Sequence, residues 1–178
     1  MNLQTEIPAW YVVAGGPSSG KTTLIKGIEK LGYYTVQEAA KFVIDENIAK
    51  GISVEDLRKD GGRFAQIVFQ KNLQLEAAAP RDRIVFFDRG IPDCIVYHKL
   101  AGLDTKHIDT ISRGRYRKVF FLDPLPFYEN DYTRPEDSDL AARLSNLLLN
   151  VYNDLDYTIV KVPPVSVEER VKLVISSL

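Results

Sequence analysis

Gly15-Gly16-Pro17-Ser18-Ser19-Gly20-Lys21-Thr22 fits the pattern G-x-x-x-x-G-K-[ST], in which a glycine-rich turn joins a buried strand to a helix. The sequence predicts both neighbours. Residues 10–14 form a short aromatic and β-branched run that is typical of a strand. After Thr22 one helical face is apolar, formed by Leu24, Ile25, Ile28 and Leu31. We therefore interpret residues 15–22 as a phosphate-binding loop (P-loop) and expect a nucleoside triphosphate as ligand.

Each part of this loop has an expected task. Backbone N–H groups at a helix N-terminus attract phosphate oxygens, and glycine lets the chain approach them closely. Lys21 is expected to span the β- and γ-phosphates, Thr22 to ligate Mg²⁺, and Thr23 to contact the α-phosphate. ATP and Mg²⁺ are thus the expected cofactors. The predicted nucleotide contacts are Gly15, Gly16, Pro17, Ser18, Ser19, Gly20, Lys21, Thr22 and Thr23.

Composition limits the possible partners. The chain has 178 residues, 45% of them hydrophobic, which predicts a single P-loop domain over residues 1–178. With 23 basic and 24 acidic residues, it has no charge excess that would favour nucleic acid or an anionic membrane. Cys94 is the only cysteine, and no long apolar run is present. We expect a cytoplasmic monomer or homodimer that acts on a small molecule.

Strand and helix patterns alternate along the chain, which predicts an α/β fold with a parallel sheet. The expected strands are residues 10–14, 33–37, 84–87, 118–122 and 157–162, each apolar enough for burial on both faces. Helices should begin near Ser53 and Ser166, which open capping boxes, and Gly61-Gly62 should divide the second helical region. A helix over residues 139–152 should bury one stripe, formed by Leu140, Leu144, Leu147, Leu148 and Val151.

The segment at residues 123–138 is rich in proline, aromatic and charged residues and is long for a connection. A loop of this kind predicts a lid in an enzyme that transfers phosphoryl groups. Arg134 within it could close over the γ-phosphate and neutralise charge in the transition state. A solvated loop arginine is the equal alternative.

Three charged residues at strand ends are candidates for the chemistry. Asp88 follows the third strand, where it could hold Mg²⁺ or accept a proton, and Arg89 could grip phosphate or an anionic acceptor. The alternative is a structural Asp88–Arg89 ion pair. Glu38 closes the second strand and could bind substrate hydroxyls, or could simply favour the helix dipole. The predicted catalytic residues are Lys21, Asp88, Arg89 and Arg134, the substrate residues Glu38, Asp88 and Arg89, and the metal ligands Thr22 and Asp88. His98 is expected at the surface or an edge.

The P-loop, Asp88-Arg89-Gly90 and Arg134-Pro135-Glu136-Asp137 together give the chain a resemblance to a family of small ATPases, from about residue 11 to about residue 174. These are grouped with the NadR-type kinase domain, which phosphorylates ribosylnicotinamide. The resemblance implies a P-loop NTPase of the nucleoside-kinase and nucleotide-kinase type, a three-layer αβα sandwich with sheet order 2-3-1-4-5. It also implies that Lys21 and Thr22 contact phosphate and Mg²⁺, Asp88 is the strand-end carboxylate, and Arg134 is a lid arginine.

Three functions follow from these features. The first is a kinase that transfers the γ-phosphoryl of ATP to a hydroxyl of a nucleoside-like or other small metabolite. The second is a nucleotide-dependent switch or sensor with slow hydrolysis, and the third is a scaffold without turnover. A Ras-like GTPase is disfavoured because no Asn-Lys-x-Asp occurs. A hydrolytic AAA motor is disfavoured because Arg89 stands where such motors usually place a glutamate.

Overall fold

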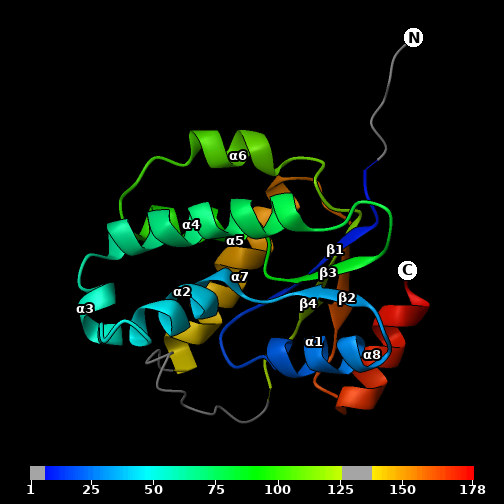
Figure 1. Ribbon diagram of the computed structural model, residues 1–178. Coiled ribbons are helices and arrows are strands. Elements are labelled where there is room, and N and C mark those ends of the chain that lie inside the picture. The colour runs from blue at the N-terminus through cyan, green and yellow to red at the C-terminus, as the bar shows by residue number, and fades with distance from the viewer. Residues whose placement is uncertain (1–6, 126–137) are drawn as a thin grey trace.

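A parallel sheet lies between two layers of helices in the computed structural model, which describes residues 7–125 and 138–178. Within these ranges five strands pair in parallel in the order β2-β3-β1-β4-β5 (Figure 1). The strands are β1 (Trp10–Gly15), β2 (Tyr34–Val36), β3 (Val85–Asp88), β4 (Lys118–Leu122) and β5 (Ile159–Val162). The expected α/β fold and the sheet order 2-3-1-4-5 are therefore confirmed.

The sequence placed the strands correctly but was wrong about the burial of the two edge strands. β1 and β3 are buried throughout, and β4 nearly so. β2 and β5, at the two edges of the sheet, are only partly buried. An apolar run shows that a segment suits a pleated surface, but it does not show whether a second strand covers its outer side.

Alternate residues of β1 enter two separate cores because successive strand side chains point to opposite faces. Tyr11 and Val13 pack with α1 (Lys21–Lys30) and α8 (Val167–Ser176). Trp10, Val12 and Ala14 pack with the helices of the other layer. These are α4 (Gly61–Ala78), α5 (Asp93–Leu100), α6 (Lys106–Ser112) and α7 (Ser138–Asp154).

Side chains cap the starts of α3, α4 and α8. Ser53 caps α3 (Val54–Arg58) by accepting from the Asp56 N–H, and Ser166 forms a complete capping box at α8. The glycine pair does mark the predicted break, but it forms the first turn of α4 behind the N-cap Asp60. α2 (Ala39–Ile48) completes this helical region. On α1, Leu31 was predicted to continue the apolar helical face, but it is the C-cap and is 59% exposed.

The apolar stripe of α7 was also predicted wrongly in part. Leu144, Leu148 and Val151 are buried, but Leu140 and Leu147 are exposed. The buried face instead includes small residues at Ala141 and Ser145, because the P-loop backbone approaches the helix there: a Cβ on Gly16 would lie 2.9 Å from Ser145 Cβ and 3.0 Å from the Ala141 carbonyl. The spacing of large apolar residues in the sequence cannot predict a contact between small residues and a loop backbone.

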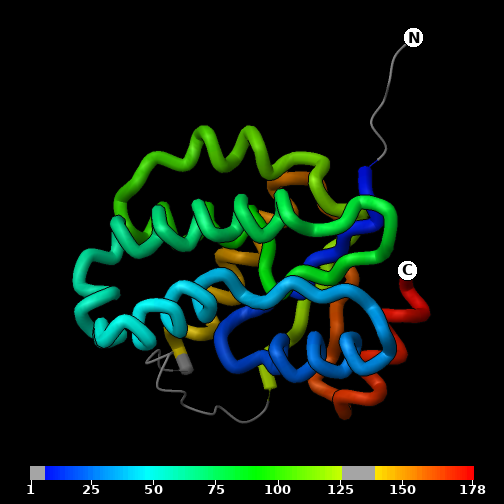
Figure 2. The backbone as a smooth tube through the Cα atoms, viewed as in Figure 1, coloured from blue at the N-terminus to red at the C-terminus, as the bar shows by residue number. Residues whose placement is uncertain are grey.

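The carboxyl ends of the strands form one edge of the sheet. β1 leads into the P-loop and β3 ends at Asp88, and both turns emerge at the same end of the sheet (Figure 2). Most of the predicted lid, including Arg134, lies outside the described residues. In the part of the chain that is described, no helix has both the length and the apolarity that a membrane span requires.

Candidate active site

The P-loop turns tightly because glycine stands where the backbone needs it. Gly15 has φ 143° and Gly20, the N-cap of α1, has φ 85°. A Cβ on Gly15 would lie 2.8 Å from the Leu122 carbonyl and 2.9 Å from Ser19 Oγ, so a larger residue would clash. The loop therefore closes on itself, with α1 beginning at Lys21.

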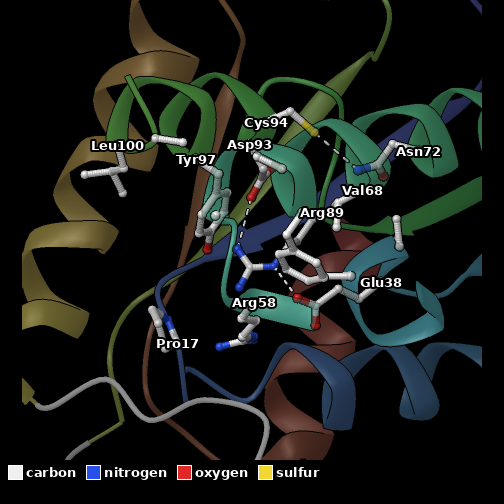
Figure 3. A pocket seen from close by; sticks show the side chains of 16 residues that line it. Pro17, Glu38, Arg58, Val68, Asn72, Arg89, Asp93, Cys94, Tyr97 and Leu100 are labelled. Atoms are coloured by element: carbon white, nitrogen blue, oxygen red, sulfur yellow. Dashed lines mark hydrogen bonds and ion pairs between the residues drawn. The ribbon is translucent and has the colours of Figure 1, made fainter. Parts of the chain in front are cut away.

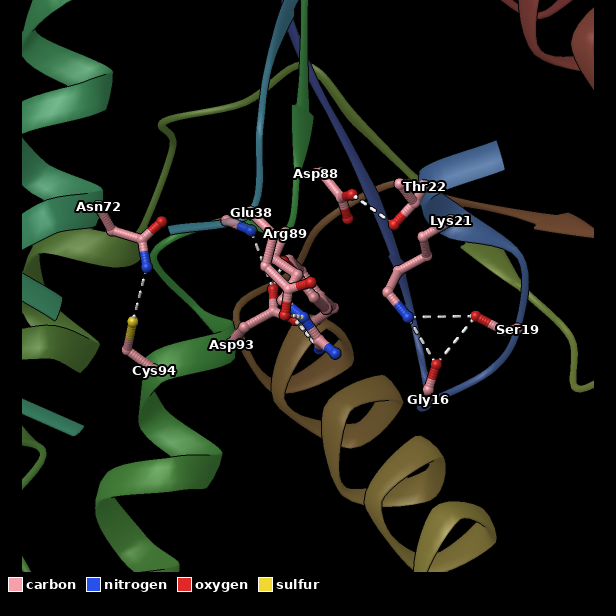
Figure 4. A network of polar contacts seen from close by, with 12 residues as sticks. Gly16, Ser19, Lys21, Thr22, Glu38, Asn72, Asp88, Arg89, Asp93 and Cys94 are labelled. Atoms are coloured by element: carbon pink, nitrogen blue, oxygen red, sulfur yellow. Dashed lines mark hydrogen bonds and ion pairs between the residues drawn. The ribbon is translucent and has the colours of Figure 1, made fainter. Parts of the chain in front are cut away.

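Lys21 is buried and folds back into the loop. Its ammonium donates to the Gly16 carbonyl at 2.6 Å and to Ser19 Oγ at 3.3 Å, while Ser19 Oγ donates to the same carbonyl at 2.9 Å (Figure 4). The positive charge thus lies inside the turn, where a phosphate-binding role requires it. Thr23, by contrast, is exposed on the first turn of α1.

Thr22 and Asp88 meet at the end of the sheet. Thr22 Oγ1 donates to Asp88 Oδ2 at 3.3 Å, because β3 lies beside β1 and pairs Asp88 with Val13. A hydroxyl and a carboxylate are hard oxygen ligands of the kind that Mg²⁺ prefers. No group of three or more His, Cys, Asp or Glu side chains gathers as a metal site within residues 7–125 and 138–178. The pair therefore fits an ion that takes its remaining ligands from water and phosphate.

Arg89 makes its ion pairs away from Asp88. Its Nε donates to Glu38 Oε1 at 2.9 Å and its Nη1 to Asp93 Oδ1 at 3.2 Å, with all three side chains buried (Figure 4). The structural Asp88–Arg89 pair considered above is not what forms. Burial by itself would lower the pKa of the Arg89 guanidinium, but the Tyr97 hydroxyl and the surrounding carboxylates outweigh burial and raise the pKa well above its usual range.

Asp93 and Tyr152 complete this network, and neither was predicted from the sequence. Asp93 Oδ2 accepts hydrogen bonds from the Gly90 N–H at 3.0 Å and from the Tyr152 hydroxyl of α7. Burial and the neighbouring Asp93 raise the pKa of Tyr152 well above its usual range, so the phenol stays protonated as a donor. The signal for Asp93 was its place at the first turn of a helix just after Asp88-Arg89-Gly90, whereas Tyr152 had none.

A cavity of about 350 Å³ opens beside this network, between the P-loop and helices α2, α4 and α5 (Figure 3). Glu38 and Arg89 line it, as expected for an acceptor site, but Asp88 does not. Aromatic and aliphatic side chains form most of the remaining wall. The lining comprises Pro17, Glu38, Ala39, Ala40, Arg58, Gly61, Phe64, Ala65, Val68, Asn72, Arg89, Asp93, Cys94, Tyr97, Leu100 and Ala101.

His98 is buried rather than at the surface, so the prediction for it was wrong. It is 4% exposed on α5, its Nδ1 lies 2.9 Å from the Cys94 carbonyl oxygen, and its ring meets Phe69 edge-on. Burial lowers the pKa of His98. The sequence pattern of α5 predicted an exposed face at His98, but this helix is buried on most sides.

The fold is shared with several small-molecule kinases. A crystal structure of NadR protein in complex with NR superposes with a TM-score of 0.60 at 20% identity, over 88% of this chain and 46% of that one, so the chain spans about half its length. Shikimate kinase from Aquifex aeolicus gives 0.60 at 18% identity, over 94% of this chain and 95% of that one. Deoxyadenosine kinase from M. mycoides gives 0.58 at 17%, over 94% and 97%.

The sequence itself assigns the family. A search of curated proteins found no significant match to the chain. A family model described as an AAA domain matches residues 10–170, a range that includes the P-loop, Asp88 and the Arg89 network. The chain belongs to this family of AAA domains and has the fold of a P-loop kinase.

Proposed function

We propose that this protein is a small-molecule kinase, which transfers the γ-phosphoryl group of ATP to a hydroxyl of a nucleoside-like or other small metabolite. The observation that carries the proposal is the cavity beside the P-loop with Glu38 and Arg89 in its wall. A switch that only hydrolyses its nucleotide has no need of such an acceptor site. The fold neighbours named as kinases of small molecules support the same class.

On the nucleotide side, the P-loop would hold the triphosphate with its backbone N–H groups and Lys21. For this, the Lys21 ammonium would exchange the Gly16 carbonyl for phosphate oxygens. Thr22 and Asp88 would hold Mg²⁺, which when bound neutralises charge on the phosphate oxygens. Arg134 of the proposed lid would add a further positive charge.

On the acceptor side, two carboxylates would have different roles. Glu38 lines the cavity, so it would bind the acceptor hydroxyl and take its proton, while Asp88 would serve the metal. The acceptor oxygen forms a bond to the γ-phosphorus, the bond from that phosphorus to the bridging oxygen breaks, and ADP leaves. Arg89 is engaged with Glu38 and Asp93, so it would orient Glu38 rather than grip an anionic acceptor.

The test is phosphoryl transfer from labelled ATP, with Mg²⁺, to a panel of nucleosides and other small hydroxyl compounds. We expect at least one acceptor to be labelled by the wild-type protein. Asp88→Asn should still bind ATP but lose transfer, because charge is removed with little change of shape, and Lys21→Ala should bind ATP far more weakly. Release of inorganic phosphate that no acceptor alters would contradict the kinase and favour the switch.

A further inference from the structure

We propose that Arg170 of α8 is a positioning residue of the nucleotide site: a buried cation behind the P-loop whose charge is balanced by the bound polyphosphate. This rests on the nucleotide binding proposed above. Arg170 lies outside the sequence patterns that predicted the site, since it is far along the chain from the P-loop and belongs to no phosphate-binding motif.

The contacts of Arg170 place it against the loop. Its side chain is 3% exposed. Nη1 donates to the Ser19 carbonyl at 2.8 Å, and Nε donates to the Pro163 carbonyl, at the end of β5, at 2.9 Å. One guanidinium therefore joins the P-loop to the loop that precedes α8.

The positive charge of Arg170 has no close negative partner among the residues that the structure describes. Among residues 7–125 and 138–178, no carboxylate lies within ion-pair distance of it, and its buried Nη2 has no hydrogen-bond acceptor. Asp123 acts on it only from farther away, since that carboxylate pairs with Lys161 at 3.5 Å. A buried charge without a partner is costly, which distinguishes Arg170 from Arg89 with its two carboxylates. Burial accordingly lowers the pKa of Arg170.

A polyphosphate across the loop would supply the missing negative charge. The peptide bond is planar and trans, so a Ser19 carbonyl held toward Arg170 turns the Gly20 N–H to the opposite side. In the proposed complex that side faces the phosphates. The guanidinium thus fixes the plane of the Ser19–Gly20 peptide. Its charge also adds to the positive potential at the N-terminus of α1, which the loop presents to the phosphates.

Gly20 shows how closely the two groups fit. A Cβ at this position would lie 2.9 Å from Arg170 Nη1, and its φ of 85° is one that other residues rarely adopt. Glycine is therefore required at position 20 both for the left-handed turn and for the close approach of Arg170 from α8. Interaction between the last described helix and the loop is part of how the loop holds its shape.

The experiment compares Arg170→Gln, which removes the charge, with Arg170→Lys, which keeps it. Titration calorimetry measures the Kd for ATP with Mg²⁺, and urea unfolding without nucleotide measures stability. We expect Arg170→Gln to bind ATP at least tenfold more weakly while unfolding at the wild-type urea concentration or a higher one. Arg170→Lys should recover most of the affinity. Lys172→Gln, on the exposed side of the same helix, is the matched control and should change neither.

Three results would overturn the inference. Wild-type affinity for ATP in Arg170→Gln would show that the charge is not used. A parallel loss of affinity and stability, not recovered by Arg170→Lys, would show a purely structural brace. Failure of the wild-type protein itself to bind ATP would overturn the proposed function as well, so the two failures are distinguishable.

Discussion

Arg89 is the central residue of the proposed acceptor side, because it joins Glu38 to Asp93. Its backbone has φ 70°, a left-handed conformation that costs a residue with a Cβ about 1–2 kcal/mol. The cost is tolerated because the Arg89 N–H donates to the Val13 carbonyl at 3.1 Å, and because Glu38 and Asp93 hold the guanidinium. Strained backbone at a buried ion-pair network is a feature of functional sites.

Replacing Glu38 by Gln tests this network. The change keeps the shape of the side chain but removes one of the two carboxylates of Arg89, so the free energy of unfolding should fall by about 1–3 kcal/mol in urea. Under the proposed function, phosphoryl transfer should also be lost. Asp45→Asn, in the exposed Lys41–Asp45 pair of the same helix, is the control and should cost less than about 0.5 kcal/mol. An equal cost for both variants would contradict the role given to Arg89.

His98 predicts how stability depends on pH. Because burial lowers its pKa in the folded state, the unfolded chain takes up the proton first as pH falls below about 6.5. The free energy of unfolding should therefore decrease from pH 7.5 to pH 5.5. Urea unfolding at both values should show a smaller decrease for His98→Gln than for the wild-type protein. An unchanged slope in His98→Gln would refute the assignment.

At the scale of elements, α7 contacts both halves of the site. Its Ala141 and Ser145 pack against Gly16 of the P-loop, and about two turns beyond Ser145 its Tyr152 donates to Asp93. A Cβ on Gly90 would lie 3.1 Å from the Tyr152 hydroxyl, so the turn after β3 is shaped to admit this contact. One rigid helix thus fixes the distance between the nucleotide loop and the Arg89 network.

Tyr152→Phe separates these two contacts. The variant removes only the hydroxyl, which leaves Asp93 without one donor and Arg89 less firmly held. We expect the KM for the acceptor to rise about three- to tenfold while the Kd for ATP stays unchanged, because the P-loop end of α7 is untouched. A comparable rise in the KM for the acceptor and in the Kd for ATP would indicate that the hydroxyl stabilises the whole of α7.

At the scale of the whole molecule, the sheet separates two cores and brings all the polar chemistry to one edge. α1 and α8 close one face, and α4 to α7 close the other. Because β1 contributes alternate residues to the two cores, a ligand that fixes the loop after β1 is connected to the packing on both sides of the sheet. Binding should consequently stabilise the protein as a unit.

Thermal unfolding measures this effect. ATP with Mg²⁺ at about one hundred times its Kd should add about 2.7 kcal/mol, which for a chain of this size raises Tm by roughly 5–10 °C. Lys21→Ala should reduce the shift strongly, since the ammonium inside the loop is lost. A shift of equal size in that variant would place the nucleotide elsewhere.

The sequence predicted the parts of this protein that depend on local patterns. Gly15 and Gly20 predicted a tight turn, and both have the positive φ angles that such a turn requires. Asp88 was located from its place at the end of a buried strand. Contacts between distant segments were out of reach. Nothing near Arg170 or Tyr152 in the sequence shows that Arg170 meets Ser19 or that Tyr152 meets Asp93, because both contacts depend on how the helices pack. His98 was misjudged because helical periodicity assumes one exposed face.

The single cysteine offers a reporter for movement at the acceptor cavity. Cys94 is buried in its wall, its Sγ accepts from Asn72 Nδ2 at 3.3 Å, and burial raises the pKa of the thiol to about 12. An aromatic disulfide reagent should therefore react only when α4 and α5 part. Its rate of colour development under native conditions then measures how often that wall opens, and an authentic acceptor should slow it without any engineered label.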